Sequence, residues 1–155
     1  DMRVVGAMSD LRDAILLPSG LLELRAYRRG VLVEEWSGHN LVVGTGRAAQ
    51  ARLLGAASAN DRVTQIAFGT GGAAPADGNT ALTNPFTKAV DGVTYPTATS
   101  VRFAFSLAVN EANGKAILEF GLLTQAGALY ARKIRTAALN KDTDLTLSGS
   151  WTITF

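Results

Sequence analysis

The sequence predicts a mainly β protein: an antiparallel β-sandwich of about seven or eight short strands, with two short helices and an N-terminal arm. Short runs of β-branched, aromatic and leucine residues recur from Leu21 to the end of the chain, separated by Gly, Asn and Asp. Hairpin-type turns follow most of these runs, which favours antiparallel pairing. Each run also has one polar or small face, which is typical of a sheet with one side in water.

Composition supports a single compact domain. The chain has 155 residues, of which 47% are hydrophobic, with 16 Gly, no Cys and one His. A chain of this length buries a substantial core without disulfide bonds. The absence of cysteine excludes disulfides and thiolate metal sites, and a single histidine excludes His-rich metal sites. We therefore expect no metal and no cofactor, with an arm over residues 1–20 and a β-sandwich domain over residues 21–155.

The charge balance argues against nucleic acid as a partner. Lys and Arg together number 15 against 13 Asp and Glu, a formal net charge of +2, whereas binding to a phosphate backbone needs clustered cations. Most of the cations are arginine, which favours carboxylate contacts at interfaces. No apolar run approaches the roughly 18 to 20 residues that span a bilayer, so we expect a soluble protein without membrane insertion.

The arm is predicted to contain a short helix. Ser9 to Leu17 combines a capping residue, early acids and apolar residues at helical spacing, and Pro18-Ser19-Gly20 ends it. The spacing places Leu11 and Ile15 on one side. Because a helix of about nine residues is unstable alone in water, we expect these two side chains to contact another subunit or a neighbouring protein. A frayed terminus is the alternative.

The first half of the domain reads as strands interrupted by one helix. Arg28-Arg29-Gly30 predicts a hairpin turn into Val31 to Trp36, and Ser37 to Asn40 predicts a break before the next short strand. Arg47 to Ala57 is rich in Ala and Leu and predicts the second helix, with Gly55 near its end. Val63 to Phe68 predicts a further strand.

Residues 69–99 show an excess of Gly, Ala, Pro, Asn and Thr without a sustained apolar period. A loop of this length in a small domain is usually functional or lies against a neighbour. Tyr95, next to Pro96, is the candidate surface contact in this loop.

The second half gives the clearest strand signals. Residues 101–109 and 145–155 both alternate apolar with small or polar residues. Asn113-Gly114 predicts a hairpin leading into Ile117 to Leu123, and Gln125-Ala126-Gly127 a turn into Leu129 to Arg135. The residues predicted to form the core are Phe103, Phe105, Leu107, Leu122, Leu147, Trp151 and Ile153.

Two glycine-rich motifs resemble nucleotide-binding loops. Gly44 to Ala49 fits G-x-G-x-x-A between a strand and a helix, but the acid expected about 20 residues later is missing and the strands are not of the parallel βαβ type. Gly69 to Gly72 lacks the lysine of a phosphate-binding loop. Both are better interpreted as turns.

Candidate catalytic groups are few. His39 stands in the predicted break and is interpreted as a turn residue bonded to backbone, since no nucleophile motif accompanies it. Glu34 and Glu35 should point to opposite faces of a strand, and Glu111 and Glu119 flank a predicted hairpin, so neither pair suggests a glycosidase site. Trp36, Tyr95 and Trp151 could together form a sugar-binding platform, but Trp151 is in register with the core. We predict no enzymatic activity and no catalytic residue.

Several strings of residues resemble small structural proteins of tailed bacteriophages, a family associated with tail fibres, baseplates and other tail appendages. The strings follow one another at the family's spacing over residues 21–155: Gly38 to Arg47, Ile66 to Gly71, Asn79 to Leu82, Glu111 to Gly114, Glu119 to Leu122 and Trp151 to Phe155. These strings are segments typical of turns and strands, and they contain no catalytic signature.

The resemblance implies a non-enzymatic virion subunit in the tail region, assembled in the bacterial cytoplasm. It implies self-association, with a trimer or hexamer suited to a tail axis, and contact with other tail proteins. The alternative is a receptor- or glycan-binding module at a fibre tip, with Tyr95 and residues 69–99 as the surface that would contact the host receptor.

Overall fold

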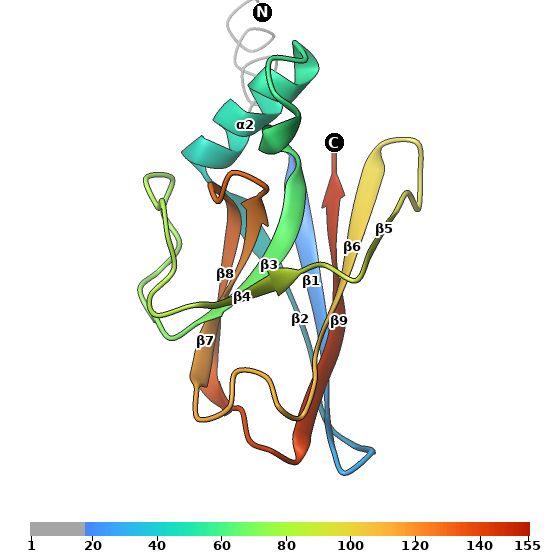
Figure 1. The fold of residues 1–155 in the computed structure, drawn as a ribbon, viewed down its shortest axis with the longest axis vertical. Coiled ribbons are helices and arrows are strands. Elements are labelled where there is room, and N and C mark those ends of the chain that lie inside the picture. Colours follow the sequence, from blue (N-terminus) through green and yellow to red (C-terminus); the bar gives the residue numbers. More distant parts are fainter. Residues whose placement is uncertain (1–17) are drawn as a thin grey trace, which may run out of the picture.

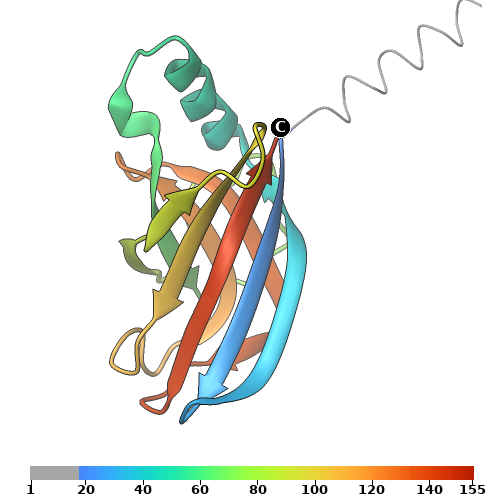
Figure 2. The same ribbon diagram turned by 90° about the vertical axis from the view of Figure 1, so that its right-hand side faces the viewer.

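A computed structural model describes residues 18–155, and nine antiparallel strands form one sheet that curls into a half-barrel (Figures 1 and 2). The strand order is β4-β3-β7-β8-β2-β1-β9-β6-β5. The mainly β, antiparallel class is therefore confirmed. The strand number differs from the prediction, and a single curled sheet stands where we expected a sandwich. The strands are β1 (Ser19–Arg28), β2 (Val31–Val42), β3 (Val63–Gly69), β4 (Phe86–Ala89), β5 (Gly92–Thr94), β6 (Ser100–Leu107), β7 (Ala116–Thr124), β8 (Leu129–Asn140) and β9 (Leu145–Thr154).

Strand β2 makes the two halves of the sheet continuous. It pairs with β1 from Val31 to Asn40, but with β8 only through Leu41 and Val42. The sheet therefore bends where β2 passes from one neighbour to the other. We expected a break at residues 37–40, but the structure has an unbroken strand there, because those residues stay paired with the start of β1.

The two outer strands are consecutive in the chain and tie the edges of the sheet together. Only Val90 and Asp91 separate β4 from β5. The amide of Val90 donates to Thr64 O at 3.0 Å, and that of Asp91 donates to Ala104 O at 2.7 Å. The connection between β4 and β5 thus bridges the two edges of the sheet. The long segment 69–99 therefore contains two strands that its composition did not predict.

The core fills the inner, concave face of the sheet. Phe68 of β3 contacts both Phe105 and Phe120, with ring centroids 5.9 and 5.8 Å apart and edge-to-face geometry. The Trp151 indole is fully buried and donates from Nε1 to Asn40 Oδ1 at 2.7 Å. All seven residues that the alternation assigned to the core are buried, which confirms the register of β6 and β9.

The connections confirm two predicted hairpins and correct a third. Arg29 and Gly30 both have positive φ, as a tight β1–β2 turn requires, and Gly127 has φ +92° between β7 and β8. Gly114 also has positive φ, but the strands that flank it have other neighbours: β6 lies between β9 and β5, and β7 between β3 and β8. The predicted Asn113-Gly114 hairpin is wrong because this turn carries the chain from one half of the sheet to the other.

Helix α2 (Gly44–Leu54) covers one end of the half-barrel (Figure 1). It begins three residues before the predicted start and ends at Leu54, with Gly55 as its C-cap, near the predicted end. Gly46 packs so closely on β8 that a Cβ there would lie 2.1 Å from Tyr130 O. The short 3-10 helix η1 (Ala59–Asp61) follows, and Arg52 binds Asp61 with two hydrogen bonds of 2.9 and 2.7 Å.

The predicted first helix, with Leu11 and Ile15, lies outside the described residues. Within residues 18–155, no helix is long and apolar enough to cross a membrane.

Candidate functional site

The clearest candidate site is an apolar pocket of about 460 Å³ at the end of the half-barrel that carries α2. We call it the end pocket. Segments far apart in the sequence build it, because α2, the start of β3, the connection from β5 to β6 and the end of β9 all meet at this end. Its lining is mainly apolar and consists of Gln50, Leu53, Arg62, Val63, Val93, Tyr95, Ala98, Thr99, Ser100, Val101, Phe103, Tyr130, Ile153 and Phe155.

One polar pair lies in the wall of the end pocket. The Tyr130 hydroxyl donates to Gln50 Oε1 at 2.9 Å, which joins β8 to α2. Burial raises the pKa of Tyr130 to about 12. The phenol therefore stays neutral and acts as a hydrogen-bond donor, not as a base, at physiological pH.

Tyr95 lies on the rim of the end pocket and is 75% exposed. Its exposure agrees with the prediction that it is a surface residue of the long segment. Phe155 also lines the end pocket, and its backbone amide donates to Thr99 O at 2.9 Å, which holds the last strand against the rim. The end pocket can therefore bury an apolar group, with aromatic edges around it.

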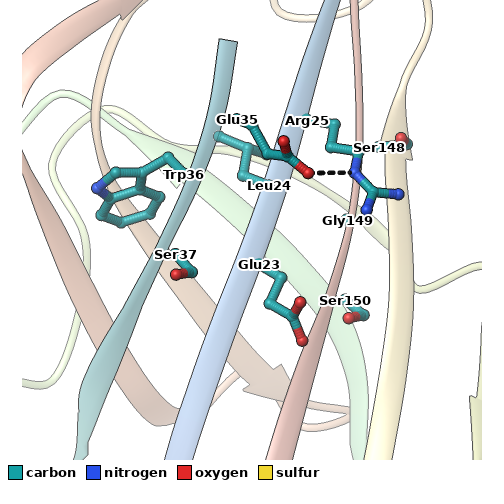
Figure 3. A pocket seen from close by; sticks show the side chains of 9 residues that line it. All are labelled: Glu23, Leu24, Arg25, Glu35, Trp36, Ser37, Ser148, Gly149 and Ser150. Atoms are coloured by element: carbon teal, nitrogen blue, oxygen red, sulfur yellow. Dashed lines mark hydrogen bonds and ion pairs between the residues drawn. The ribbon is translucent and has the colours of Figure 1, made fainter.

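A second hollow lies on the outer face of the sheet, across β2, β1 and β9 (Figure 3). Arg25 donates to Glu35 at 3.0 Å on one side, and both side chains are more than half exposed. The small side chains of Ser148 and Ser150 create the depression in the surface. Exposed pairs of this kind contribute little to binding or stability, so this hollow is a weaker candidate than the end pocket.

The remaining candidate aromatic residues do not form a platform. Trp36 is half-buried, stacks on Phe120 with ring centroids 5.8 Å apart, and lies under Arg135 at 5.1 Å. Trp151 is in the core, as predicted. Of the three aromatic residues considered, Tyr95 is the exposed one.

The candidate catalytic residues lie apart from one another and from the end pocket. His39 is exposed on the outer face of β2 opposite Leu21, so it is a strand residue and not the turn residue we expected. Glu35 binds Arg25 on the same outer face, whereas Glu34 binds Arg135, so the two carboxylates diverge as predicted.

The two carboxylates that flank Asn113-Gly114 have separate structural roles. Glu111 accepts hydrogen bonds from Lys88 Nζ and the amide of Ala108, both at 2.8 Å, and the lysine holds the pKa of Glu111 below its usual range. Glu119 is 1% exposed and accepts from Arg132 Nε at 2.8 Å. Neither carboxylate faces an open cleft with the other.

Glu119 also anchors the segment that follows β3. Its Oε2 accepts from the amides of Gly71 and Thr83, at 2.7 and 2.8 Å. Arg132 donates to Asn79 Oδ1 at 3.2 Å, which fixes the middle of the same segment. Three of the strings quoted above, around Gly71, Asn79 and Glu119, therefore meet at one buried ion pair.

The glycine-rich motif Gly44 to Ala49 forms the start of α2 and contacts the same segment. The amide of Gly44 donates to Asp77 O at 2.9 Å, and Arg47 binds the Asp77 carboxylate at 2.7 Å. The helix start is thus occupied by the chain's own segment. This geometry agrees with our interpretation of the motif as a turn and helix start.

Sequence reasoning named Tyr95 as a surface residue but missed that it lies on the rim of a pocket, and it also missed three exposed apolar residues at the opposite end. Val31, Leu32 and Val33 follow the β1–β2 turn and are 65%, 47% and 53% exposed. Val and Leu residues predict a strand whether their side chains are buried or exposed, so nothing in the sequence marked these three as exposed.

No group of three or more His, Cys, Asp or Glu side chains in the described part of the chain could hold a metal ion. Comparisons with known protein families, with curated proteins and with solved structures give no match.

Proposed function

We propose that the protein is a non-enzymatic structural subunit that associates with copies of itself, and that it works in the tail region of a bacteriophage virion. The observation that carries self-association is the position of exposed apolar side chains at the two opposite ends of the long axis (Figure 1). The virion setting, as part of a baseplate, fibre or other tail appendage, is supported by the resemblance of the quoted strings.

The first end is the tip of the β1–β2 hairpin, which we define as residues 31–33. Three consecutive apolar side chains are exposed there, whereas a strand normally turns every second one into the core. Such a run is unfavourable in water unless a partner covers it. The second end is the end pocket, where Tyr95, Val93 and Phe155 are exposed around an apolar hollow.

Two unlike apolar surfaces at opposite ends suit a head-to-tail contact, in which the hairpin tip of one copy enters the end pocket of the next. Contacts of this type are heterologous, so they close into a ring or continue as a filament, depending on the rotation between copies. Both outcomes fit a subunit of a tail appendage.

The ionisable groups support a structural role. Glu119 is occupied by Arg132 and two backbone amides, and Glu111 by Lys88 and a backbone amide. Groups held in this way stabilise connections between strands and are not poised for proton transfer.

Two variants and their mixture test the head-to-tail contact. Leu32→Asp places a charge on the hairpin tip and leaves the end pocket intact, whereas Tyr95→Asp does the reverse. We expect the unaltered chain to associate with rising concentration in analytical ultracentrifugation, and each variant alone to remain monomeric. An equimolar mixture should give dimers and nothing larger, because only one kind of intact contact remains.

Ala104→Asp is the matched control, since Ala104 is exposed on the outer face of β6; this variant should associate like the unaltered chain. Monomers at every concentration of the unaltered chain, or association that neither Leu32→Asp nor Tyr95→Asp weakens, would contradict the proposal. The virion setting is tested separately, by locating the subunit in a density map of the intact particle.

Exposure of Tyr95 on the pocket rim also favours a second candidate, the receptor- or glycan-binding module. Aromatic faces stack on the apolar faces of sugars, and the rim is accessible. A glycan array and a cell-adsorption assay would then show saturable binding that Tyr95→Ala removes. Such binding by a protein that remains monomeric would favour this candidate over the assembly subunit.

A further inference from the structure

Helix α2 has an apolar side without a partner among the described residues. Its buried side consists of Gly46 and Ala49. On another side, Arg47, Ala51 and Leu54 follow each other at helical spacing, and Leu54 is 92% exposed. These residues form a groove of about 540 Å³, which we call the helix groove, lined by Pro18, Arg47, Gln50, Ala51, Leu53 and Leu54.

The chain itself enters at this groove. Pro18 is one of its lining residues, and β1 starts at the next residue and runs away along the half-barrel (Figure 2). The seventeen residues that precede Pro18 therefore connect directly to the helix groove, without a spacer. The predicted helix, Ser9 to Leu17, ends at the residue before Pro18.

We propose that residues 9–17 of the same chain lie in the helix groove as a second short helix, with Leu11 and Ile15 packed on Ala51 and Leu54. The lengths agree. Nine helical residues extend ~13 Å and the part of α2 that lines the groove, Arg47 to Leu54, extends ~12 Å.

The chemistry of the segment matches the groove as well. Leu11, Ala14 and Ile15 stand at positions i, i+3 and i+4 and share one side of a helix. The small side chains of Ala14 and Ala51 permit a close approach of the two helices. The helix groove therefore supplies the apolar surface that a helix of this length needs in water.

Charge complementarity supports the same pairing. The segment carries Asp10 and Asp13. Arg47, which lines the groove, binds Asp77, yet its side chain remains 39% exposed. A segment with acids in its first turns therefore meets an arginine whose charge is still accessible.

Connectivity favours the chain's own groove over that of a neighbour. A segment tethered at Pro18 has an effective concentration near the groove in the millimolar range, which a second copy reaches only in concentrated solution. This proposal differs from our expectation from the sequence that the arm contacts another subunit, and the experiment below distinguishes the two. It rests on different observations from the head-to-tail contact proposed above. The two surfaces are neighbours, because Gln50 and Leu53 line both the groove and the end pocket.

A disulfide between introduced cysteines tests the docking, because the chain has no Cys of its own. In the full chain, Ile15→Cys is combined with Ala51→Cys and oxidised at low micromolar concentration. We expect a disulfide within one chain, seen as the loss of the mass of two hydrogen atoms and as faster migration in a non-reducing gel. Ile15→Cys combined with Ala104→Cys is the control and should not form one, since Ala104 lies on the outer face of β6.

Hydrogen exchange gives a second measure that does not require cysteine. Amides of residues 9–17 should exchange more slowly than in an isolated peptide of the same sequence. Leu54→Asp should lower their protection factors about tenfold or more. Leu54 is so exposed that the variant retains the fold of the half-barrel. Leu32→Asp, at the far end, should leave the protection unchanged.

Two results would overturn the proposal. The first is a disulfide that forms only between chains, which would place the segment on a second copy. The second is the absence of both the disulfide and the Leu54-dependent protection, which would leave the helix groove without this occupant.

Discussion

The two halves of the curled sheet differ in what covers their outer face. On β1, β9 and β6 the outer face is open, and residues such as Glu23, Ser148 and Ala104 lie exposed there. On β3, β7 and β8 the segment between β3 and β4 crosses the outer face, so that Ala67 is fully buried and Gly121 lies against Leu82. We call these the open half and the covered half.

The difference explains which strands alternate in sequence. In the open half, one face meets water and the other the core, so apolar and polar residues alternate along β6 and β9. In the covered half both faces of β7 are largely buried, and this strand reads as a nearly continuous apolar run that contains a buried glutamate. The covered half therefore depends on specific polar contacts as well as on apolar packing.

The open half gives the first prediction. Phe105→Ala should lower the free energy of unfolding by about 3 to 5 kcal/mol, because its ring is 1% exposed and its removal leaves a cavity. Ser106→Ala, on the opposite face of the same strand, should be nearly silent. Urea denaturation measures both, and equal effects at the two positions would mean that the open half does not have one dry and one wet face.

The covered half gives the second prediction. Glu119→Gln removes the charge that compensates the buried guanidinium of Arg132, so it should cost about 3 to 5 kcal/mol. It should also release the segment around Gly71 and Thr83, which increased proteolysis there would reveal. The matched variant in the open half is Glu35→Gln, in the exposed pair with Arg25, where we expect less than about 1 kcal/mol. Comparable losses in the two variants would remove the distinction between the halves.

The third prediction concerns the join between α2 and the covered half. Gly46→Ala introduces a Cβ that would lie 2.1 Å from Tyr130 O, so the helix must move away from β8. We expect a loss of about 1 to 3 kcal/mol and an altered environment of Tyr130 in near-ultraviolet circular dichroism. Ala48→Gly, at an exposed position of the same helix, should cost about 1 kcal/mol from helix propensity alone and leave the tyrosine signal unchanged. A Gly46→Ala variant as stable as the original would show that the close contact is not required.

The smallest change in the free energy of unfolding is expected when the pH is lowered. Hydrogen bonds from Arg52, Arg47 and Arg28 hold the pKa values of Asp61, Asp77 and Asp144 below their usual range. A carboxyl whose pKa is lower in the folded state stabilises the fold above its unfolded pKa, and this contribution disappears as the pH falls through the folded value.

The free energy of unfolding should therefore decline below about pH 4, the unfolded pKa of aspartate. Asp61→Asn and Asp77→Asn, which act at α2, should flatten this decline, as denaturation at pH 3 and pH 6 would show. A decline that neither variant changes would place the acid sensitivity elsewhere in the molecule.

What the sequence could predict follows the same division. The alternation in β6 and β9 identified the core residues and their register, because successive side chains there point in turn to the core and to water. Arg29-Gly30 and Gly127 predicted their hairpins, because the positive φ that these turns require is a local property of the chain.

Other features were decided by contacts between distant segments. Asn113-Gly114 has the same local turn chemistry as a hairpin, yet the tertiary structure places β6 and β7 in different halves of the sheet. Strands β4 and β5 are short and lack an apolar period. They form because β3 and β6 at the two edges of the sheet provide backbone groups for pairing. The end pocket combines residues from Gln50 to Phe155, so no local pattern could reveal it.

The sequence by itself therefore determined the class of the fold, the inner face of the open half and the conformation of the tight turns, because each depends on neighbouring residues and water. Only the tertiary structure decided the curl of the sheet, the burial of Glu119 with Arg132 and the two apolar ends. Each of these depends on which distant segment supplies the contact, and side-chain type alone does not specify that segment.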